Sequence, residues 1–439
     1  MKIVLFEDHL VEQLYPITVG RGAFAITCGT FRIIDLLEEL SRSLYVLCRP
    51  YLEGISRLEY PAARFGLSAL REDLENANPD ELVLVVNARM VPNAEFLEFL
   101  ASFRSSEPLC WQDTLAAVVY STAELLEMLD GRPDDFYDLS ELCAKEQRVT
   151  EHATDHSLEL FDFPHDIVRE NMALFNGNLE CRLQKHILTA TGRAESPKTD
   201  GSWKEIRDGV FVGKNVRVGE YLVTDTTQGP ILIDEGASVG PFCFLKGPVY
   251  VGPYSKIIEH AALKDYVGMT HTTKVGGEVE ASTIEPYTNK QHHGFLGHSY
   301  LGSWINLGAG TCNSDLKNTY GTVSMTYDSG RVATTMQFHG CIIGDYSKTA
   351  INTSIFTGKI IGSCSMIYGF VTRNVPSFVN YARSFNQCTE LPVEVMISTQ
   401  KRMFARRNVA QTLVHVELLH KMFALTQSER QMENEPLSL

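Results

Sequence analysis

The stretch from Asn289 to Tyr320 combines reactive side chains with regularly spaced glycines. It contains the pair His292 and His293, and Asn306 follows fourteen residues after His292. Histidine is the side chain best suited to remove a proton from an amine or a hydroxyl near neutral pH. A neighbouring carboxamide can orient a sugar hydroxyl or stabilise an oxyanion. Taken alone, histidines in such a stretch are more often ordinary surface residues. Whether they are functional is therefore judged from the sequence pattern around them.

Aliphatic residues recur at every sixth position on both sides of this stretch. Six-residue steps fit neither a single amphipathic strand nor the helical period, but they suit a solenoid that turns a corner every six residues. Three such steps close one triangular coil of a parallel β-helix, about eighteen residues long, in which each coil buries an apolar layer against the next. Gly240 and Gly252 directly follow two aliphatic positions, where a small residue lets the backbone turn. The inward positions are Ile233, Val239, Leu245, Val251, Ile257 and Leu263, then Ile343, Thr349, Ile355, Ile361 and Ile367, and Val212 and Val218 extend the pattern.

The coil length places the two reactive side chains relative to each other. Because fourteen residues is less than one coil of about eighteen, we expect His292 and Asn306 to lie near each other on neighbouring faces.

Length, charge and cysteine content limit the class of protein. The chain has 439 residues and a formal net charge of -15, which predicts two or three domains and argues against general nucleic-acid binding while leaving local cationic pockets open. Its ten cysteines form no C-x-x-C pair and are interpreted as reduced thiols of a cytoplasmic protein. The apolar run at the start is too short for a signal peptide and is interrupted by Glu7 and Asp8. No apolar stretch approaches the length of a transmembrane helix.

The first part of the chain alternates buried strands with helices, which indicates a sheet covered by helices. Ligands in such sheets lie beyond the carboxyl ends of the strands, here the Thr18–Gly22 loop and the Asn87–Arg89 segment. The expected strands are Ile3–Phe6, Leu44–Cys48 and Leu82–Val86, and the expected helices are about Phe31–Ser43, Ala94–Phe103 and Thr122–Leu129.

The remaining segments define the expected domains. A polar, acidic segment at 130–147 is expected to be an exposed connection or lid, and helices at Asp166–Phe175 and Leu179–Leu188 are expected to close the first domain. Gly, Ser, Pro and Lys then mark a linker. The expected units are an α/β domain at 1–191, a linker at 192–207, a parallel β-helix at 208–376 and a helical cap and tail at 377–439.

After Pro376 the pattern becomes helical. Val393, Met396, Ile397 and Phe404 share one face of a first helix, and Thr412 is the expected N-cap of a second helix that ends near Leu425. The pair of helices would cap the open end of the solenoid. The first helix is basic, and a solvated face is favoured over a phosphate clamp for its cations Lys401, Arg402, Arg406 and Arg407.

The spacing around the histidines resembles a known family. His292, Phe295-Leu296-Gly297 and the Ile305–Thr311 segment resemble the acetyltransferase half of the bifunctional N-acetylglucosamine-1-phosphate uridylyltransferase/glucosamine-1-phosphate acetyltransferase, in which H-x-x-Y-L-G precedes x-N-I-G-A-G-T at the same separation. The resemblance implies a left-handed β-helix and a homotrimer that binds acyl-coenzyme A, with acetyl-coenzyme A expected, between its subunits. It implies that His292 is the general base.

The resemblance also implies binding residues. Phe295 stands where the family usually has a Tyr that binds the sugar phosphate. The family's Asn-Tyr pair after G-A-G-T corresponds to Asn313-Ser314-Asp315 only if the alignment contains a gap. The implied sugar-phosphate set is Lys290, Phe295, Asn306, Asn313, Asp315 and Lys317. Thr349, Ala350 and Lys359 lie in a segment similar in position to the coils that bind the coenzyme.

The first domain resembles the matching sugar nucleotidyltransferase domain as a divergent, uridylyltransferase-like branch, through L-Y-P-I-T-x-x-R at its opening loop. Thr18, Arg21, Asn87 and Arg89 are the nucleotide-binding candidates. The usual Gly-rich loop is reduced to Gly20-Arg21-Gly22, and Arg89 occupies the place of a magnesium-binding Asp. Arg89 cannot bind a metal but can bind a phosphate. Mg²⁺ is therefore left open, with Asp8, Glu7 and Asn176 as substitute ligands.

Three functions follow as hypotheses. The first is acyl transfer from acyl-coenzyme A to an amino-sugar phosphate or nucleotide sugar on the β-helix, next to a nucleotidyltransferase-like domain. The second keeps sugar-1-phosphate nucleotidyl transfer as the main activity, with Arg21 and a rearranged metal site. The third is a non-catalytic trimeric scaffold that binds a sugar nucleotide. Ligand binding without turnover would separate the third from the others.

Overall fold

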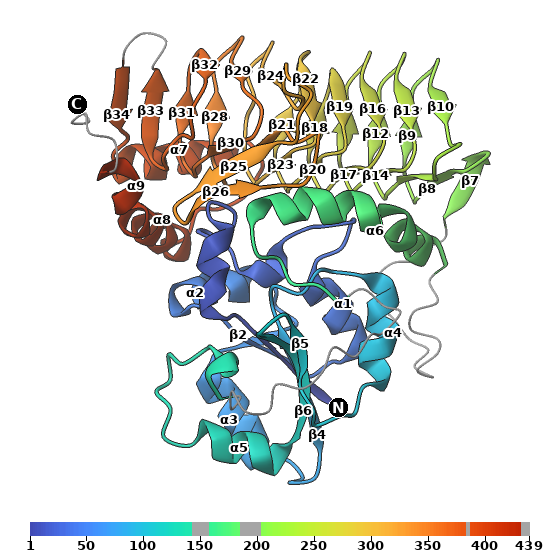
Figure 1. The fold of residues 1–439 in the computed structure, drawn as a ribbon. Coiled ribbons are helices and arrows are strands. Elements are labelled where there is room, and N and C mark those ends of the chain that lie inside the picture. Colours follow the sequence, from blue (N-terminus) through green and yellow to red (C-terminus); the bar gives the residue numbers. More distant parts are fainter. Residues whose placement is uncertain (143–157, 185–202, 383–386, 432–439) are drawn as a thin grey trace.

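The structure is a computed structural model that describes residues 1–142, 158–184, 203–382 and 387–431. It contains an α/β domain beside a long β-helix, with a helical segment at the C-terminal end of the coils (Figure 1). The end of the acidic segment expected at 130–147 and the expected boundary at residue 191 lie outside the described residues.

The α/β domain is built on a six-stranded sheet with the order β3-β2-β1-β4-β6-β5. β1, β2, β3 and β4 are parallel, and β6 and β5 are added antiparallel at one edge. Alternate residues of β1 enter two separate apolar cores, because side chains along a strand point to opposite faces. The strands are β1 Lys2–Phe6, β2 Leu44–Leu47, β3 Arg64–Phe65, β4 Leu82–Asn87, β5 Leu109–Trp111 and β6 Thr114–Ser121.

The expected strands and helices of the first 129 residues are confirmed, with one helix several residues shorter than predicted. The helix expected at Phe31–Ser43 is α1 Ile33–Leu40, because the chain is already extended at Arg32 and Ser41. The remaining short elements are three 3₁₀ turns, η1 His9–Leu14, η2 Ala23–Ala25 and η3 Leu139–Leu142. The other helices are α2 Pro50–Glu59, α3 Leu67–Glu75, α4 Ala94–Ser102 and α5 Thr122–Leu129.

A single helix, α6 Pro164–Gln184, covers the first helix predicted at the end of the domain and the described part of the second, whose last four residues lie outside the described residues. The prediction of a break near Gly177 is wrong, because Asn178 is buried and its side chain bonds the backbone of Pro92 and Ala94. The same helix packs Phe175 and Leu179 against the β-helix, so it lies between the two parts of the molecule (Figure 1).

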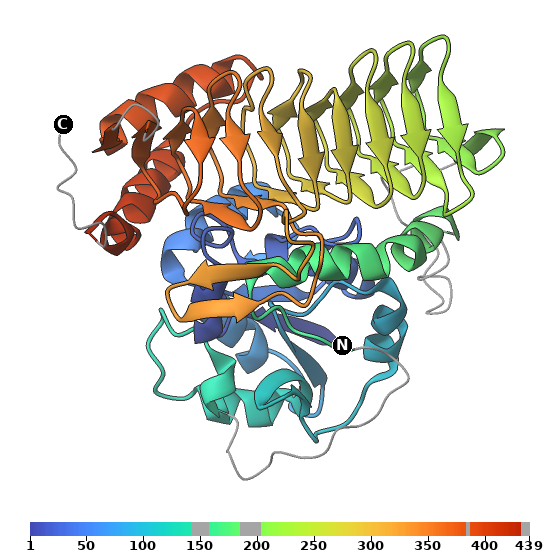
Figure 2. The same ribbon diagram turned by 45° about the horizontal axis from the view of Figure 1, so that its top comes forward.

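The predicted solenoid is a left-handed parallel β-helix, and the turned view shows its stacked coils (Figure 2). Residues of successive coils pair in register eighteen positions apart, as Ile231, Val249 and Val267 do. Both runs of inward positions and Val212 are buried, which confirms the prediction from the repeat. Val218 is exposed instead, because its strand β9 is the edge strand of its sheet and no further coil covers it. At Gly252 a Cβ atom would lie 2.6 Å from the carbonyl oxygen of Met269, which explains the small residue there.

The coils present three faces, of which the first is one continuous sheet and lies against the α/β domain. Part of the expected linker, 204–207, is an antiparallel edge strand of this sheet. Its strands are β7 Lys204–Arg207, β8 Val210–Val212, β11 Ile231–Ile233, β14 Val249–Val251, β17 Val267–Met269, β20 Thr283–Ile284, β23 Tyr300–Leu301, β27 Cys341–Ile343 and β30 Lys359–Ile361.

Each of the other two faces is divided into two sheets. An insertion after β24 carries the hairpin of β25 Ser324–Tyr327 and β26 Gly330–Ala333, and β24 pairs with β29 across it. The second face contains β9 Arg217–Val218, β12 Ser238–Val239, β15 Lys256–Ile257, β18 Lys274–Val275, β21 Asn289–Lys290, β28 Lys348–Thr349, β31 Met366–Ile367, β33 Val379–Ala382 and β34 Gln387–Glu390. The third contains β10 Val223–Asp225, β13 Phe244–Lys246, β16 Ala262–Lys264, β19 Glu278–Glu280, β22 Phe295–Gly297, β24 Cys312–Asn313, β29 Ser354–Ile355 and β32 Phe370–Val371.

Three helices follow the coils: α7 Val393–Ala405, α8 Leu413–Leu425 and α9 Gln427–Gln431. Thr412 is the N-cap residue of α8, as predicted. The helices do more than cover the coils, because Leu418, Leu419 and Met422 of α8 join the core of the α/β domain. The C-terminal helices therefore hold the two parts of the molecule together (Figure 1).

Candidate functional site

One cavity of about 500 Å³ brings His292 and Asn306 together. It lies between the second face of the β-helix and the end of α7. We call it the His292 pocket. Its polar and charged lining residues are Lys274, Asn289, Gln291, His292, Asn306, Lys348, Arg406 and Arg407.

Four of these residues form a column across successive coils. Lys274 pairs with Asn289, Asn289 with Asn306, and Asn306 with Lys348, all as parallel neighbours. Asn306 therefore bridges the two parts of the second face at the insertion. His292 follows Asn289 by three residues, which places it at the edge of the column. The imidazole of His292 and the carboxamide of Asn306 are exposed, and neither has a hydrogen-bond partner among the described residues.

An aromatic stack holds the end of α7 over this column. The ring of Phe404 lies 4.4 Å from the ring of Trp304, and Trp304 stacks on Tyr287 at 4.2 Å. The guanidinium of Arg407 then donates to the side-chain oxygen of Asn289 at 2.6 Å. The predicted solvated basic face fits Lys401, Arg402 and Arg406, whose side chains are exposed, whereas Arg407 is partly buried. Arg406 and Arg407 also line the pocket.

The pocket carries positive charge without a carboxylate in its lining. Burial lowers the pKa of Lys348 to about 8. Burial also lowers the pKa of Lys274, and the nearby cations Arg407, Lys256 and Arg406 lower it further. The pKa of Arg407 is lowered by burial and by Arg406. An anion in the pocket would relieve this repulsion. Sequence reasoning missed Lys274 and Lys348, although both directly precede inward positions of the repeat.

Lys290 was expected to bind the sugar phosphate, but the structure buries it beneath the pocket. Its side chain is 2% exposed, and its ammonium group donates to the carbonyl oxygens of Gly276 at 2.7 Å and His292 at 2.8 Å. Lys290 therefore fixes the backbone of the histidine rather than a ligand. Burial lowers the pKa of Lys290 to about 8.

This buried lysine predicts a pH dependence of stability. Its pKa in the folded protein lies below its ordinary value of 10.5, so between pH 8 and pH 10.5 the unfolded chain binds the additional proton. The free energy of unfolding of the wild type should therefore rise across this range relative to that of Lys290→Met. Urea denaturation of both proteins at pH 7 and at about pH 10 measures the difference. A difference that does not change with pH would contradict the assignment.

The other sugar-phosphate candidates lie outside the His292 pocket. Asn313 is buried, and its carboxamide bonds both backbone groups of Gly297. Asp315 accepts a hydrogen bond from His298, with 2.8 Å between the carboxylate oxygen and Nδ1. Lys317 donates to the backbone of Thr322, and Phe295 is partly buried on the third face. These side chains maintain the coils and the insertion in this structure.

The coenzyme candidates do not line this pocket either, although the backbone of Thr349 donates to the carbonyl of Asn306. Thr349 is buried, and its hydroxyl contacts Thr311 Oγ1 at 2.7 Å and accepts from the backbone of Gly308. The carbonyl of Ala350 accepts hydrogen bonds from inside the coil. Lys359 is partly buried, which lowers its pKa, and Arg331 and Lys317 lower it further. The structure thus gives Thr349 a structural role within the β-helix.

The nucleotide-binding candidates of the first domain are engaged inside the protein. The guanidinium of Arg89 is fully buried and donates to both carboxylate oxygens of Asp8, to Asp162 and to the carbonyl of Phe161. Asn87 donates to Asp8 and accepts from the Arg89 backbone. Thr18 donates to the carbonyl of Val11. The expectation that these three side chains face a nucleotide is therefore not met in this structure.

The magnesium candidates do not fit a metal site. Both oxygens of Asp8 are taken by Arg89 and Asn87, and Glu7 is paired with Arg49. Asn176 donates to the carbonyl of Gln228 on the β-helix, away from the strand ends. Among the residues that the structure describes, no group of three or more His, Cys, Asp or Glu could hold a metal ion. Magnesium requires several free oxygen ligands, which this arrangement does not supply.

Arg21, at the tip of the loop after β1, crosses to the β-helix. Its guanidinium donates to Asp345 at 2.5 Å and to Ser303 at 2.7 Å, and it lies 3.3 Å from Glu285. Glu285 in turn accepts from Thr27 and from Tyr300. The Thr18–Gly22 loop, which was expected to hold a nucleotide, is therefore bound to the coils through Ser303 and Asp345. Ser303 precedes Asn306 by three residues.

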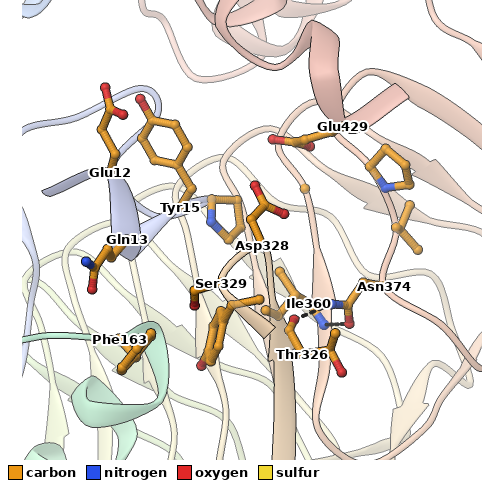
Figure 3. Close-up of a pocket in the computed structure, with 15 residues that line it drawn as sticks. Glu12, Gln13, Tyr15, Phe163, Thr326, Asp328, Ser329, Ile360, Asn374 and Glu429 are labelled. Atoms are coloured by element: carbon orange, nitrogen blue, oxygen red, sulfur yellow. Dashed lines mark hydrogen bonds between the residues drawn. The ribbon is translucent and has the colours of Figure 1, made fainter. Parts of the chain in front are cut away.

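A second cavity, of about 480 Å³, has the opposite character (Figure 3). It lies between the first domain, the β25–β26 hairpin and α9, and Glu12, Asp328 and Glu429 line it. No predicted site residue lines this cavity, and its carboxylates would repel a phosphate. The His292 pocket is therefore the better candidate for a phosphorylated substrate.

None of the described helices is long and apolar enough to cross a membrane.

Comparison with known proteins agrees with the α/β fold of the first domain. Residues 3–185 match the family described as sugar nucleotidyl transferase. The chain is similar to the bifunctional protein GlmU of Cyanothece sp., with 28% identity over 38% of this chain and 28% of the relative. It is also similar to a bifunctional sugar-1-phosphate nucleotidylyltransferase/acetyltransferase of Sulfurisphaera tokodaii, with 29% identity over 32% of this chain and 36% of the relative. The matches thus span about a third of these relatives or less.

A solved structure, the UDP-N-acetylglucosamine acyltransferase of Arabidopsis, covers 53% of this chain and 83% of its own, with 15% identity and a TM-score of 0.25. A TM-score of 0.25 is too low to support a shared fold. The β-helix is instead identified from the register of its own strands.

Proposed function

We propose that the β-helix transfers an acyl group from acyl-coenzyme A to the amine of a phosphorylated or nucleotide-linked amino sugar. The observation that supports this most strongly is the His292 pocket, in which an exposed imidazole and an exposed carboxamide share a cationic cavity. The similarity to bifunctional sugar-phosphate transferases supports the same class of substrate.

In the proposed reaction the sugar amine attacks the thioester carbonyl. The new bond joins nitrogen to the acyl carbon, and the carbon–sulfur bond breaks. His292 takes the proton from the amine, and the coenzyme leaves as a thiol after receiving a proton. Asn306 orients a sugar hydroxyl or stabilises the oxyanion. Lys290 holds the backbone of His292 in place. As the family resemblance implies, we further propose a homotrimer whose neighbouring subunits bind the coenzyme.

The second candidate is nucleotidyl transfer by the first domain, and the family match to residues 3–185 favours it. The geometry favours it less, because Asp8, Asn87 and Arg89 form a closed network and Arg21 is bound to the coils. We therefore propose that the first domain mainly positions the β-helix.

The choice of acceptor tests the proposed function. Thiol release from acetyl-coenzyme A is measured with glucosamine 1-phosphate, with its N-acetylated form and with glucose 1-phosphate. We expect turnover only with the free amine, because the amine is the proposed nucleophile. Equal rates with all three acceptors, or no thiol release with a panel of amino-sugar phosphates and nucleotides, would overturn the proposal.

A further inference from the structure

The end of α7 brings two arginines to the same wall of the His292 pocket. Arg406 is the C-cap residue of the helix, and Arg407 follows it. We propose that Arg406 and Arg407 form a clamp for a phosphate ester, so that the C-terminal helix completes the site on the β-helix. This inference rests on the proposed function for the identity of its ligand.

The charges around the clamp favour binding of an anion. Lys274 and Lys348 line the same cavity from the coils, and no carboxylate lines it. Four cations around about 500 Å³ repel one another, and the repulsion is strongest where the groups are shielded from water. A purely structural role for the helix end would not need this arrangement, since a neutral side chain could cover the cavity at lower electrostatic cost.

The clamp is partly fixed before any ligand binds. The stacking of Phe404 on Trp304 anchors the last turn of α7, and Asn289 holds the guanidinium of Arg407 through a hydrogen bond of 2.6 Å. The side chain of Arg406 is exposed and makes no hydrogen bond or ion pair with the described residues. One arginine is therefore held in position and its neighbour is available.

The donor chemistry fits a phosphate ester. A guanidinium presents a planar fork of N–H donors that matches the oxygens of phosphate, and the two lysines add point charges. Both proposed substrates carry phosphate esters, one in the amino-sugar acceptor and one in coenzyme A. The shared chemistry is therefore the phosphoryl group, and its source is a matter for experiment.

Binding measurements test the clamp without depending on turnover. The dissociation constants of glucosamine 1-phosphate and coenzyme A are measured by calorimetry for the wild type, Arg406→Gln and the double variant Arg406→Gln/Arg407→Gln. We expect the double variant to bind one of these ligands about tenfold or more weakly, because it loses charge-assisted hydrogen bonds. The matched control is Lys401→Gln/Arg402→Gln, which removes two exposed cations of the same helix outside the pocket.

The pattern of affinities identifies the source of the phosphate. A selective loss for glucosamine 1-phosphate assigns the clamp to the acceptor, and a selective loss for coenzyme A assigns it to the acyl donor. Either result supports the clamp. Unchanged affinities in the double variant, or an equal loss in the control, would overturn it. Arg406→Gln guards against misfolding, since the guanidinium of Arg406 has no described bond to lose and glutamine keeps the backbone N–H that closes α7. If binding depends on the clamp but no thiol is released, the proposed function fails and the clamp stands.

Discussion

Replacement of His292 by glutamine is expected to lower kcat for acyl transfer by about 10²- to 10⁴-fold, the usual range for the loss of a general base. Glutamine keeps a polar side chain of similar length but cannot take the proton of the attacking amine. The KM of the amino sugar should change little, because the cations and Asn306 remain in the pocket. Steady-state thiol release at saturating substrate measures the effect.

His293 provides the matched control. It is also exposed, but it does not line the His292 pocket, and its described contact is through its backbone carbonyl to Gly310. His293→Gln should therefore retain nearly full kcat. Equal losses in the two variants would mean that the coil, rather than the imidazole of His292, was disturbed.

The second large effect is on stability. Arg21→Met should lower the free energy of unfolding by about 3 to 5 kcal/mol, because it leaves the carboxylates of Asp345 and Glu285 buried without their cation. Burial already raises the pKa of Asp345, and Arg21 opposes this shift. The loss should therefore be largest at neutral pH and smaller in acid, where the carboxylates become protonated. Urea denaturation at two pH values measures both effects.

An exposed arginine of the same domain serves as the control. Arg57 pairs with Glu53 along the exposed side of α2, with its side chain 56% accessible. Arg57→Met should cost less than about 1 kcal/mol, as is usual for exposed ion pairs. If Arg21→Met were as mild as Arg57→Met, the network between the domains would not hold the loop as described.

The β-helix could be predicted because its signal is local and repeated. Each inward aliphatic residue, such as Ile233 or Val251, repeats the evidence for a coil, and the structure buries all of them except Val218 in the first coil. The column of Lys274, Asn289 and Asn306 was harder to find, because successive partners lie fifteen and then seventeen residues apart rather than eighteen. Because the coils differ in length, a fixed eighteen-residue repeat does not align these residues with one another.

The side-chain roles in the first domain could not be predicted for a different reason. Arg89 meets Asp8 across 81 positions, and Arg21 meets Asp345 across 324. The types of these residues are compatible with phosphate binding, and only the tertiary pairing shows that their donors are already engaged. For Arg406 and Arg407 the sequence favoured a solvated helix face. The packing of α7 beside Trp304, which the sequence pattern does not reveal, places both arginines in the lining of the pocket.

The most direct test of the central claim measures two products from one enzyme preparation. Wild type and His292→Gln are incubated with acetyl-coenzyme A and glucosamine 1-phosphate, and separately with magnesium, a nucleoside triphosphate and a sugar 1-phosphate. If the His292 pocket is the active site, the wild type releases thiol, His292→Gln releases it about 10²- to 10⁴-fold more slowly, and neither protein releases pyrophosphate with magnesium. Pyrophosphate release by both proteins without any thiol release would contradict it and place the chemistry in the first domain.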